Sequence, residues 1–291
     1  MSGYASGIIA ILCINLIFAY AIFVTAAAGQ LNLGGAGFQA IGGYAAATLS
    51  NYGWSAGWAT IPAAMVFTAL VGFLISFPVL RTRGVYMVLA TFAFGEVVSG
   101  FLLQSNFFGG AVGLVVPDYL PVSVLIGSAV VATLFVFFLM ATRFGLALRA
   151  IHDDEAVATV MGVNVRAAQV AVFTIGGALA GLSGALYAHH FSFVEPQYFN
   201  STLSIFVLLF VLIGGAQTAW GPLAGSLFFT LVPELMRIGG SWRFVVFGAA
   251  IVLMMAIRPE GMITRALVDR WTPRFGKRPG SSGKTGERLA Q

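Results

Sequence analysis

Charged residues are scarce in this chain. Asp, Glu, Lys and Arg make up 9% of the 291 residues, whereas hydrophobic residues make up 59% and the mean hydropathy is +0.93. Soluble domains carry a charge on roughly a quarter of their residues, so this composition excludes an ordinary soluble protein. The long continuous apolar runs are typical of membrane-spanning helices, and they argue against the short alternating strands of a transmembrane barrel.

Cysteine and N-terminal basic residues are also nearly absent. Cys13 is the only cysteine, so no intramolecular disulfide can form, and we expect a thiol buried in a span. Residues 1–6 contain no Lys or Arg, so a cleavable signal peptide is not expected.

Most of the net charge of +5 comes from the tail that begins at Arg258, and it does not indicate nucleic-acid binding. We expect residues 263–291 to form a basic, disordered cytoplasmic tail near anionic lipid headgroups.

No constellation of catalytic or metal-binding residues is visible. His189 and His190 have no Cys, Asp or Glu near them at a metal-binding spacing, and His152 precedes three acidic residues that would point in different directions on a helix. Residues 278–285 end like a phosphate-binding loop, but Arg278 occupies the place of the first glycine and no strand precedes it. We therefore expect no enzyme, metal site or bound cofactor, and any ATP would be hydrolysed by another subunit.

What the chain does contain is a series of apolar segments. About nine can be recognised, near residues 7–28, 31–50, 58–80, 84–104, 119–141, 167–191, 201–216, 219–237 and 243–257. They predict an all-α polytopic membrane protein with about 8–10 transmembrane helices. With nine spans, Arg81 and Arg83, the charged segment 143–166 and the basic tail all fall on one side, which the positive-inside rule makes cytoplasmic. The N-terminus and the loops 105–118, 192–200 and 238–242 then lie outside.

The segment 143–166 is the most polar part of the chain before the tail. It contains six charged residues and a histidine between two long apolar runs, so it must lie in water. Its residues are good helix formers, and Gly162 is placed to end the helix. A polar helix held between two membrane spans is better suited to docking on a partner than to chemistry of its own.

Two apolar segments look irregular. Residues 29–43 combine six glycines with Gln30, Asn32 and Gln39, which predicts a broken or closely packed helix. Residues 201–237 form two arms, interrupted at 214–222, that are too short for comfortable crossings, which predicts a short helical hairpin. Small residues spaced four apart between Gly177 and Gly184 predict close helix packing within the subunit.

Glu96 lies about twelve residues into the fourth span. A charge at that depth costs at least ~2.5–3.5 kcal/mol on insertion scales. Glu96 must therefore face protein, water or a partner charge, or carry a proton. A role in a translocation pathway and a structural hydrogen bond between helices both remain open at this point.

Several motifs resemble those of one membrane protein family. They are Gly29–Gly34, Leu80–Tyr86, Ala90–Glu96, Ala147–Glu155, Met161–Asn164, Gly181–Tyr187, Ile213–Gly215 with Trp220–Pro222, and Arg258–Gly261. In this order the chain resembles the LivM-type permease subunits of branched-chain amino acid ABC importers. The resemblance covers most of the chain, from residue 29 to residue 261.

The resemblance implies a permease domain over residues 1–262 in the bacterial cytoplasmic (inner) membrane, with multiple spans and a cytoplasmic coupling helix in 143–166. It implies a second homologous permease, two cytoplasmic ATPases that use ATP and Mg, an extracytoplasmic substrate-binding protein and membrane lipid as partners. The residues that it assigns to ATPase coupling are Arg149, His152, Asp153, Asp154, Glu155 and Gly162. Polarity and depth make Asn32, Thr91 and Glu96 the candidates for the translocation pathway.

Other functions compete with an importer of branched-chain or related amino acids. A related ABC importer for urea, short amides or sugars would need the same permease architecture, because specificity lies mostly in the binding protein. An ion-coupled secondary transporter would carry its own substrate and ion sites at mid-membrane, and only Glu96 supports it. A membrane enzyme is disfavoured by the missing polar constellation.

Overall fold

The computed structural model describes residues 3–54, 57–235, 248, 252 and 261–263. Its α-helices are α1 (Gly3–Ala26), α2 (Gly35–Asn51), α3 (Thr60–Val79), α4 (Val85–Gln104), α5 (Val122–Ala141), α6 (Arg143–Asp153), α7 (Glu155–Val160), α8 (Val165–Phe191), α9 (Ser201–Gly215) and α10 (Trp220–Leu235). Short 3-10 helices, η1 (Asn106–Phe108), η2 (Gly110–Val112) and η3 (Pro196–Tyr198), and the strands β1 (Leu114–Val115) and β2 (Phe193–Val194) occupy the connections. The prediction of an all-α membrane protein is confirmed.

Five helices are long and apolar enough to cross a membrane: α1, α3, α4, α5 and α8. The other three predicted spans that the structure describes are shorter, with 17 residues in α2, 15 in α9 and 16 in α10. The helix bounds agree with the apolar runs to within a few residues. The predicted ninth span, 243–257, and the tail beyond residue 263 lie outside the described residues.

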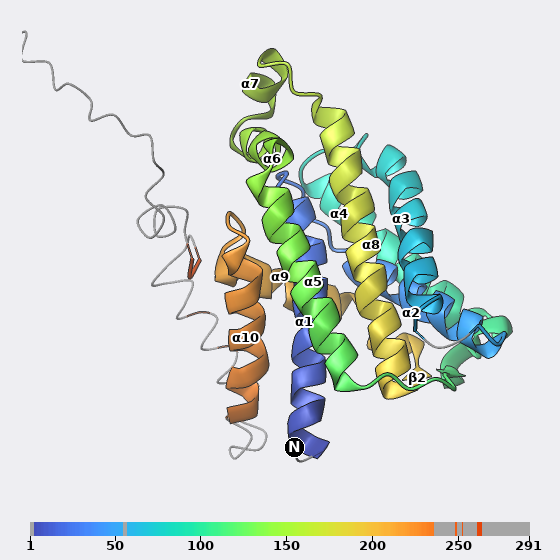
Figure 1. The fold of residues 1–291 in the computed structure, drawn as a ribbon. Helices are drawn as coiled ribbons and strands as arrows, with labels where there is room; N and C mark the ends of the chain where they lie inside the picture. The colour runs from blue at the N-terminus through green and yellow to red at the C-terminus, as the bar shows by residue number, and fades with distance from the viewer. Residues whose placement is uncertain (1–2, 55–56, 236–247, 249–251, 253–260, 264–291) are drawn as a thin grey trace, which may run out of the picture.

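Helices α1, α2 and α3 pack against α8 (Figure 1). Glycines on α8 meet the neighbouring backbones so closely that a side chain would not fit: a Cβ atom on Gly184 would lie 1.9 Å from the carbonyl oxygen of Gln39 in α2, and one on Gly177 would lie 2.9 Å from that of Thr68 in α3. The predicted small-residue packing within the subunit is therefore confirmed.

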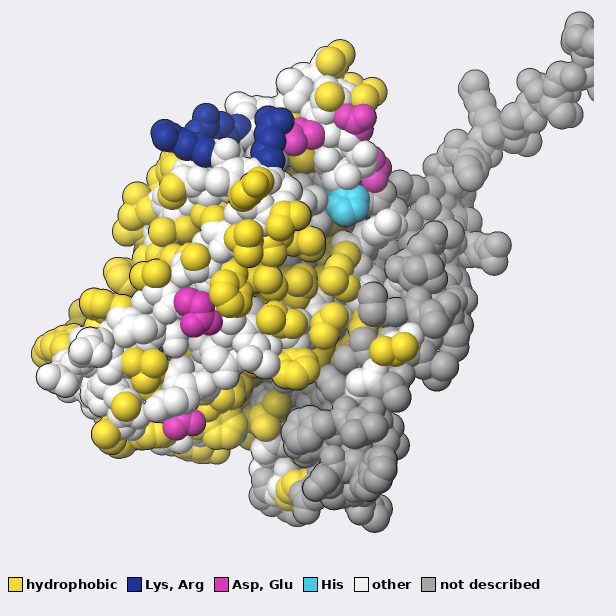
Figure 2. Space-filling model, turned by 180° about the vertical axis from the view of Figure 1, so that it is seen from behind, with side chains coloured by type: hydrophobic (Ala, Val, Ile, Leu, Met, Phe, Trp, Pro, Cys, Tyr) yellow, Lys and Arg dark blue, Asp and Glu magenta, His cyan; other side chains and the backbone are white. Residues whose placement is uncertain are grey.

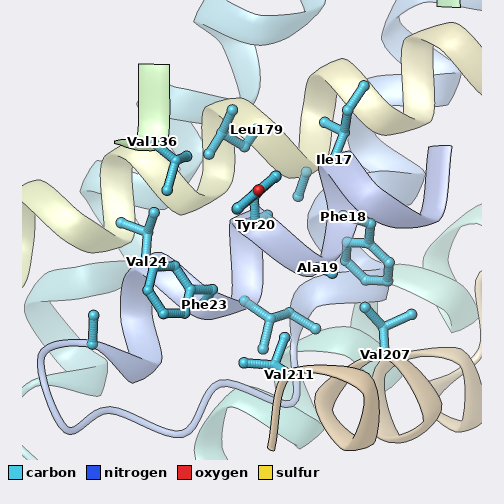
Figure 3. Close-up of a cluster of buried hydrophobic side chains, with 14 of the residues drawn as sticks. Ile17, Phe18, Ala19, Tyr20, Phe23, Val24, Val136, Leu179, Val207 and Val211 are labelled. Carbon is cyan, nitrogen blue, oxygen red and sulfur yellow. The ribbon is translucent and has the colours of Figure 1, made fainter. Parts of the chain in front are cut away.

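Helix α1 is apolar on all sides, and its middle is enclosed. Figure 3 shows Tyr20 of α1 among Val136 of α5, Leu179 of α8 and Val211 of α9. Tyr20 and the residues around it on α1 are buried, and so is Cys13, as predicted. A helix that is apolar all round can be covered by protein or by lipid, and protein covers most of α1.

One end of the molecule is closed by the loops that precede α5 and follow α8. There β1 pairs antiparallel with β2, and the Ser50 hydroxyl donates to Asp118 over 2.8 Å. The buried His189 lies 2.8 Å from the Thr60 hydroxyl of α3 and 3.2 Å from the Asp118 carbonyl oxygen, and His190 lies 2.9 Å from the Leu120 carbonyl oxygen. The two histidines thus connect α8 to this outer cap, which we define as residues 105–121 and 192–200.

The helices α6 and α7 lie at the opposite end from the outer cap and from the N-terminus (Figure 1). This arrangement follows the predicted alternation of loops between two sides. The hairpin predicted for 201–237 is also present: α9 and α10 pack against each other, and a Cβ atom on Gly225 would lie 1.9 Å from the Phe210 carbonyl oxygen.

Candidate functional site

The chain between α1 and α2 is not helical. Residues 27–34 lead from the end of α1 to the start of α2, and Gln30 and Asn32 within them are buried. The start of α2 packs against the middle of α4, since a Cβ atom on Gly37 would lie 3.0 Å from the Cα atom of Gly95. The irregular backbone therefore continues into the depth of the bundle, where its polar groups must find partners in the protein.

Side chains from three elements supply those partners. The Leu33 N–H donates to the Thr91 hydroxyl of α4 over 3.1 Å, and the Gly34 N–H donates to the Asn32 side-chain oxygen over 2.8 Å. The Ala36 N–H donates to the Ser204 hydroxyl of α9 over 2.7 Å. These bonds replace the helical ones that the first turn of α2 lacks. Both predicted features of this segment, a break and close packing, are confirmed.

Glu96 lies beside this break on an exposed face of α4. Its carboxylate accepts a hydrogen bond from the Ser201 hydroxyl, the first residue of α9. The negative charge thus stands at the positive end of the α9 dipole, which is favourable. Figure 2 shows an acidic group at mid-height of a largely uncharged face, well below the charged end of the molecule.

The three predicted pathway residues are brought into one region. A Cβ atom on Gly34 would lie 2.6 Å from the Thr91 carbonyl oxygen and 3.2 Å from the Asn32 side-chain oxygen, and one on Gly95 would lie 3.9 Å from the Ser201 hydroxyl. We call Asn32, Thr91, Glu96, Ser201 and Ser204 the polar cluster. The sequence analysis missed the two serines, whose only signal was their spacing of three at the start of an apolar helix.

The charged segment 143–166 folds as two helices and not as the single helix expected from its composition. Asp154 separates them: its backbone is extended, and its side-chain oxygen accepts from the N–H groups of Ala156 and Val157 over 2.8 and 3.0 Å. An aspartate that caps a new helix competes with continuation of the old one, and here the cap prevails. The predicted stop at Gly162 is confirmed by its φ of 84°.

The predicted coupling residues separate into two groups. Asp153, Asp154 and Glu155 are exposed, whereas Arg149 and His152 are half-buried against the bundle. The exposed acids adjoin three exposed apolar side chains that the sequence analysis did not single out: Val157, Val160 and Met161 are 51%, 90% and 75% exposed. Their signal was the presence of apolar residues in a segment that must lie in water. We call the exposed part of residues 153–161 the coupling knob.

The charged segment 143–166, which we call the coupling segment, touches the break between α1 and α2. A Cβ atom on Gly29 would lie 3.8 Å from the Cα atom of His152, so α6 rests directly on this turn. Gly29 has a φ of 76°, which favours glycine. The Gln30 side chain and the His152 Nδ1 are buried and have no hydrogen-bond partner among the residues that the structure describes. A movement of α6 would therefore be transmitted to the residues that lead into the polar cluster.

Basic side chains gather at the end that carries α6 and α7 (Figure 2). All basic residues in the described part of the chain come from the loop after α3, from α6 or from the start of α8: Arg81, Arg83, Arg143, Arg149 and Arg166. The charge asymmetry expected of a cytoplasmic face is therefore present in the described residues.

Known proteins that resemble this chain in sequence are transport permeases. The family model described as branched-chain amino acid transport system / permease component matches residues 4–256. The chain is 32% identical over 280 residues to the high-affinity branched-chain amino acid transport system permease protein LivM of Escherichia coli K12, which covers 82% of this chain and 65% of that relative. The chain thus spans somewhat less than two thirds of the length of this relative.

More distant relatives match shorter stretches. The permease protein LivH of the Escherichia coli K12 branched-chain amino acid system is 24% identical over 135 residues, which cover 46% of this chain and 44% of LivH. The nucleoside ABC transporter permease protein NupC of Lactococcus lactis is 34% identical over 113 residues, which cover 38% of this chain and 35% of NupC. No solved structure matches the chain.

Proposed function

The chain belongs to the branched-chain amino acid transport system / permease component family, and from this we propose that it is the transmembrane permease subunit of an ATP-driven importer of branched-chain or related amino acids. The polar cluster is the observation that best supports a conducting role. Lipid offers no hydrogen-bond partners to non-helical backbone or to a carboxylate. A cluster of such polar groups between apolar helices is therefore typical of a solute pathway.

Glu96 and its neighbours are suited to an amino acid. The exposed carboxylate of Glu96 can bind the ammonium group of a zwitterionic solute. The N-terminal ends of α2 and α9 present a positive potential to the carboxylate group of the same solute. We propose that Asn32 and Thr91 shape this region by holding the start of α2, while Glu96 contacts the solute.

A second permease would complete the pathway. In the isolated subunit, Glu96 is exposed. A carboxylate that faced hydrocarbon would be costly, so we propose that a homologous subunit covers this face. The similarity to both LivM and LivH, which are named as permeases of one transport system, supports such a pair.

Two cytoplasmic ATPases would drive the cycle with ATP and Mg, which this chain would not bind. The coupling knob, apolar at Val160 and Met161 and acidic beside them, would seat in a groove on an ATPase. A movement of the coupling knob would be transmitted to the start of α2 through the contact between His152 and Gly29. The substrate-binding protein would deliver the solute at the outer cap, on the outside of a bacterial cytoplasmic membrane.

A charge reversal of the coupling knob tests this assignment. We expect the combined substitution Asp153→Lys, Asp154→Lys and Glu155→Lys to abolish co-purification of the ATPases while the second permease stays bound. Glu195→Lys, an exposed acid of the outer cap, is the matched control and should leave the ATPases in place. If ATPases remain bound to the triple variant, or if uptake ignores ATP depletion but responds to an uncoupler, the ion-coupled alternative is favoured.

A related importer with a different solute is the second candidate. The similarity to a permease named for nucleosides supports it, because one architecture then serves unlike solutes. Urea, short amides and sugars belong to the same alternative. Titration of the co-purified binding protein with leucine, isoleucine, valine and these solutes decides between the two, since the importer carries whatever its binding protein retains.

A further inference from the structure

An open groove runs between α3 and α8 at the end of the molecule that carries the basic residues. Its volume is about 590 Å³, and its walls include Phe73 and Phe77 of α3 and Val170 and Ile175 of α8. Phe73 and Phe77 remain 41% and 40% exposed. Because α3 and α8 are membrane-spanning helices, an apolar groove on their surface opens toward hydrocarbon.

The mouth of the groove is basic. Arg166 and Asn164 line it, and Arg81 and Arg83 follow α3 a few residues after Phe77. Arg81, Arg83 and Arg166 are exposed. Among the described residues that line the groove, none is acidic.

The position of Arg166 is unfavourable without an anion. It lies in the first turn of α8, where the helix dipole is positive, and this turn contains no acidic residue. Asn164 caps the same turn, with its side-chain oxygen accepting from the Ala167 N–H over 3.0 Å, so its amide N–H groups are available to an acceptor. A phosphate oxygen at this point would relieve the repulsion and satisfy the amide.

We propose that this groove is a binding site for one anionic phospholipid of the inner leaflet. Its phosphate contacts Arg166 and Asn164, with Arg81 and Arg83 adding to the attraction. One acyl chain lies along Phe73, Phe77 and Val170. A headgroup held at this point would fix the start of α8, which directly follows the coupling segment. The site would act in the same way whichever solute the chain conducts.

The test uses the full chain, purified with its co-eluting partners in mild detergent and exchanged into an equimolar mixture of phosphatidylcholine and phosphatidylglycerol. Native mass spectrometry then counts the retained lipids of each kind. We expect the unmodified chain to retain phosphatidylglycerol preferentially, and Arg166→Gln to lower that preference about tenfold or more. Arg143→Gln, an exposed cation of the same end outside the groove, should keep the preference.

A second variant addresses the apolar part of the site. Ala171→Trp fills the groove and should remove the retained lipid of either kind, while the partners still co-purify. Equal losses of preference in Arg166→Gln and Arg143→Gln would overturn the proposal in favour of diffuse surface attraction. Loss of a partner subunit from Ala171→Trp with its lipid retained would also overturn it, because the groove would then be a protein interface.

Discussion

At the scale of single residues, the pair of Glu96 and Ser201 carries most of the functional argument. Glu96 stood out in the sequence because a carboxylate in an apolar run is costly. Its partner could not be predicted, since the two residues are 105 positions apart and no local pattern joins them. The structure shows a hydrogen bond between helices and an exposed side chain, and the role of Glu96 in a pathway stays a prediction.

Glu96→Gln separates these two roles. The amide oxygen can still accept from Ser201, so we expect the free energy of unfolding to change by less than about 1 kcal/mol. The negative charge is lost, and uptake of a zwitterionic solute should fall about ten- to hundredfold. Uptake into proteoliposomes that contain the complete importer measures the second effect, and thermal unfolding in detergent measures the first.

Ser201→Ala is the matched variant. It keeps the charge but removes the hydroxyl donor, so it should destabilise the fold by about 1–3 kcal/mol while the folded fraction still transports. Normal transport by Glu96→Gln, together with unfolding of Ser201→Ala, would leave Glu96 with a structural role only.

At the scale of elements, apolar length predicted where helices lie, and glycine with buried amides predicted the break before α2. The residues that hold the break open could not be predicted, because Thr91 and Ser204 reach it only through tertiary packing. The interpretation of residues 143–166 as one helix also did not predict their division into α6 and α7. Aspartate is unfavourable inside a helix and favours N-cap positions, so Asp154 carried a signal of the division that the interpretation as one helix did not use.

The contact between α6 and the turn at Gly29 gives a prediction about coupling. Gly29→Leu forces a Cβ atom into the left-handed region, which should cost about 1–2 kcal/mol. The leucine side chain extends beyond a Cβ position that already lies 3.8 Å from the His152 Cα atom, so it should displace α6 from the turn. We expect the ATPases to remain bound while the number of ATP molecules hydrolysed per transported solute rises severalfold. Parallel assays of ATP hydrolysis and uptake in the same proteoliposomes measure this ratio.

Gly53→Leu is the control for backbone strain alone. Gly53 has a φ of 85°, but a Cβ atom there would meet nothing within 4 Å. It should show the same loss of stability with an unchanged ratio of ATP to solute. An equal rise of the ratio in both variants would mean that strain, and not the contact with His152, causes the uncoupling.

At the scale of the whole molecule, the chain covers some of its faces and leaves others open. Helices α1 and α8 are mostly enclosed, whereas most residues of α3, α4 and α5 are not fully buried within the chain. The open face of α5 is apolar, with Val130, Val131 and Phe138 exposed, and lipid can cover it. The open face of α4 carries Glu96 and cannot be left to lipid.

This difference predicts where the second permease binds. Val97 adjoins Glu96 on α4 and is 69% exposed, and Val131 on α5 is 66% exposed. With a photoreactive residue in place of Val97, irradiation of native membranes should yield an adduct with the mass of two permeases. The same replacement of Val131 should yield adducts with lipid only. Permease adducts from Val131 and none from Val97 would place the partner on α5, and Glu96 would then have to be shielded by water or by lipid headgroups.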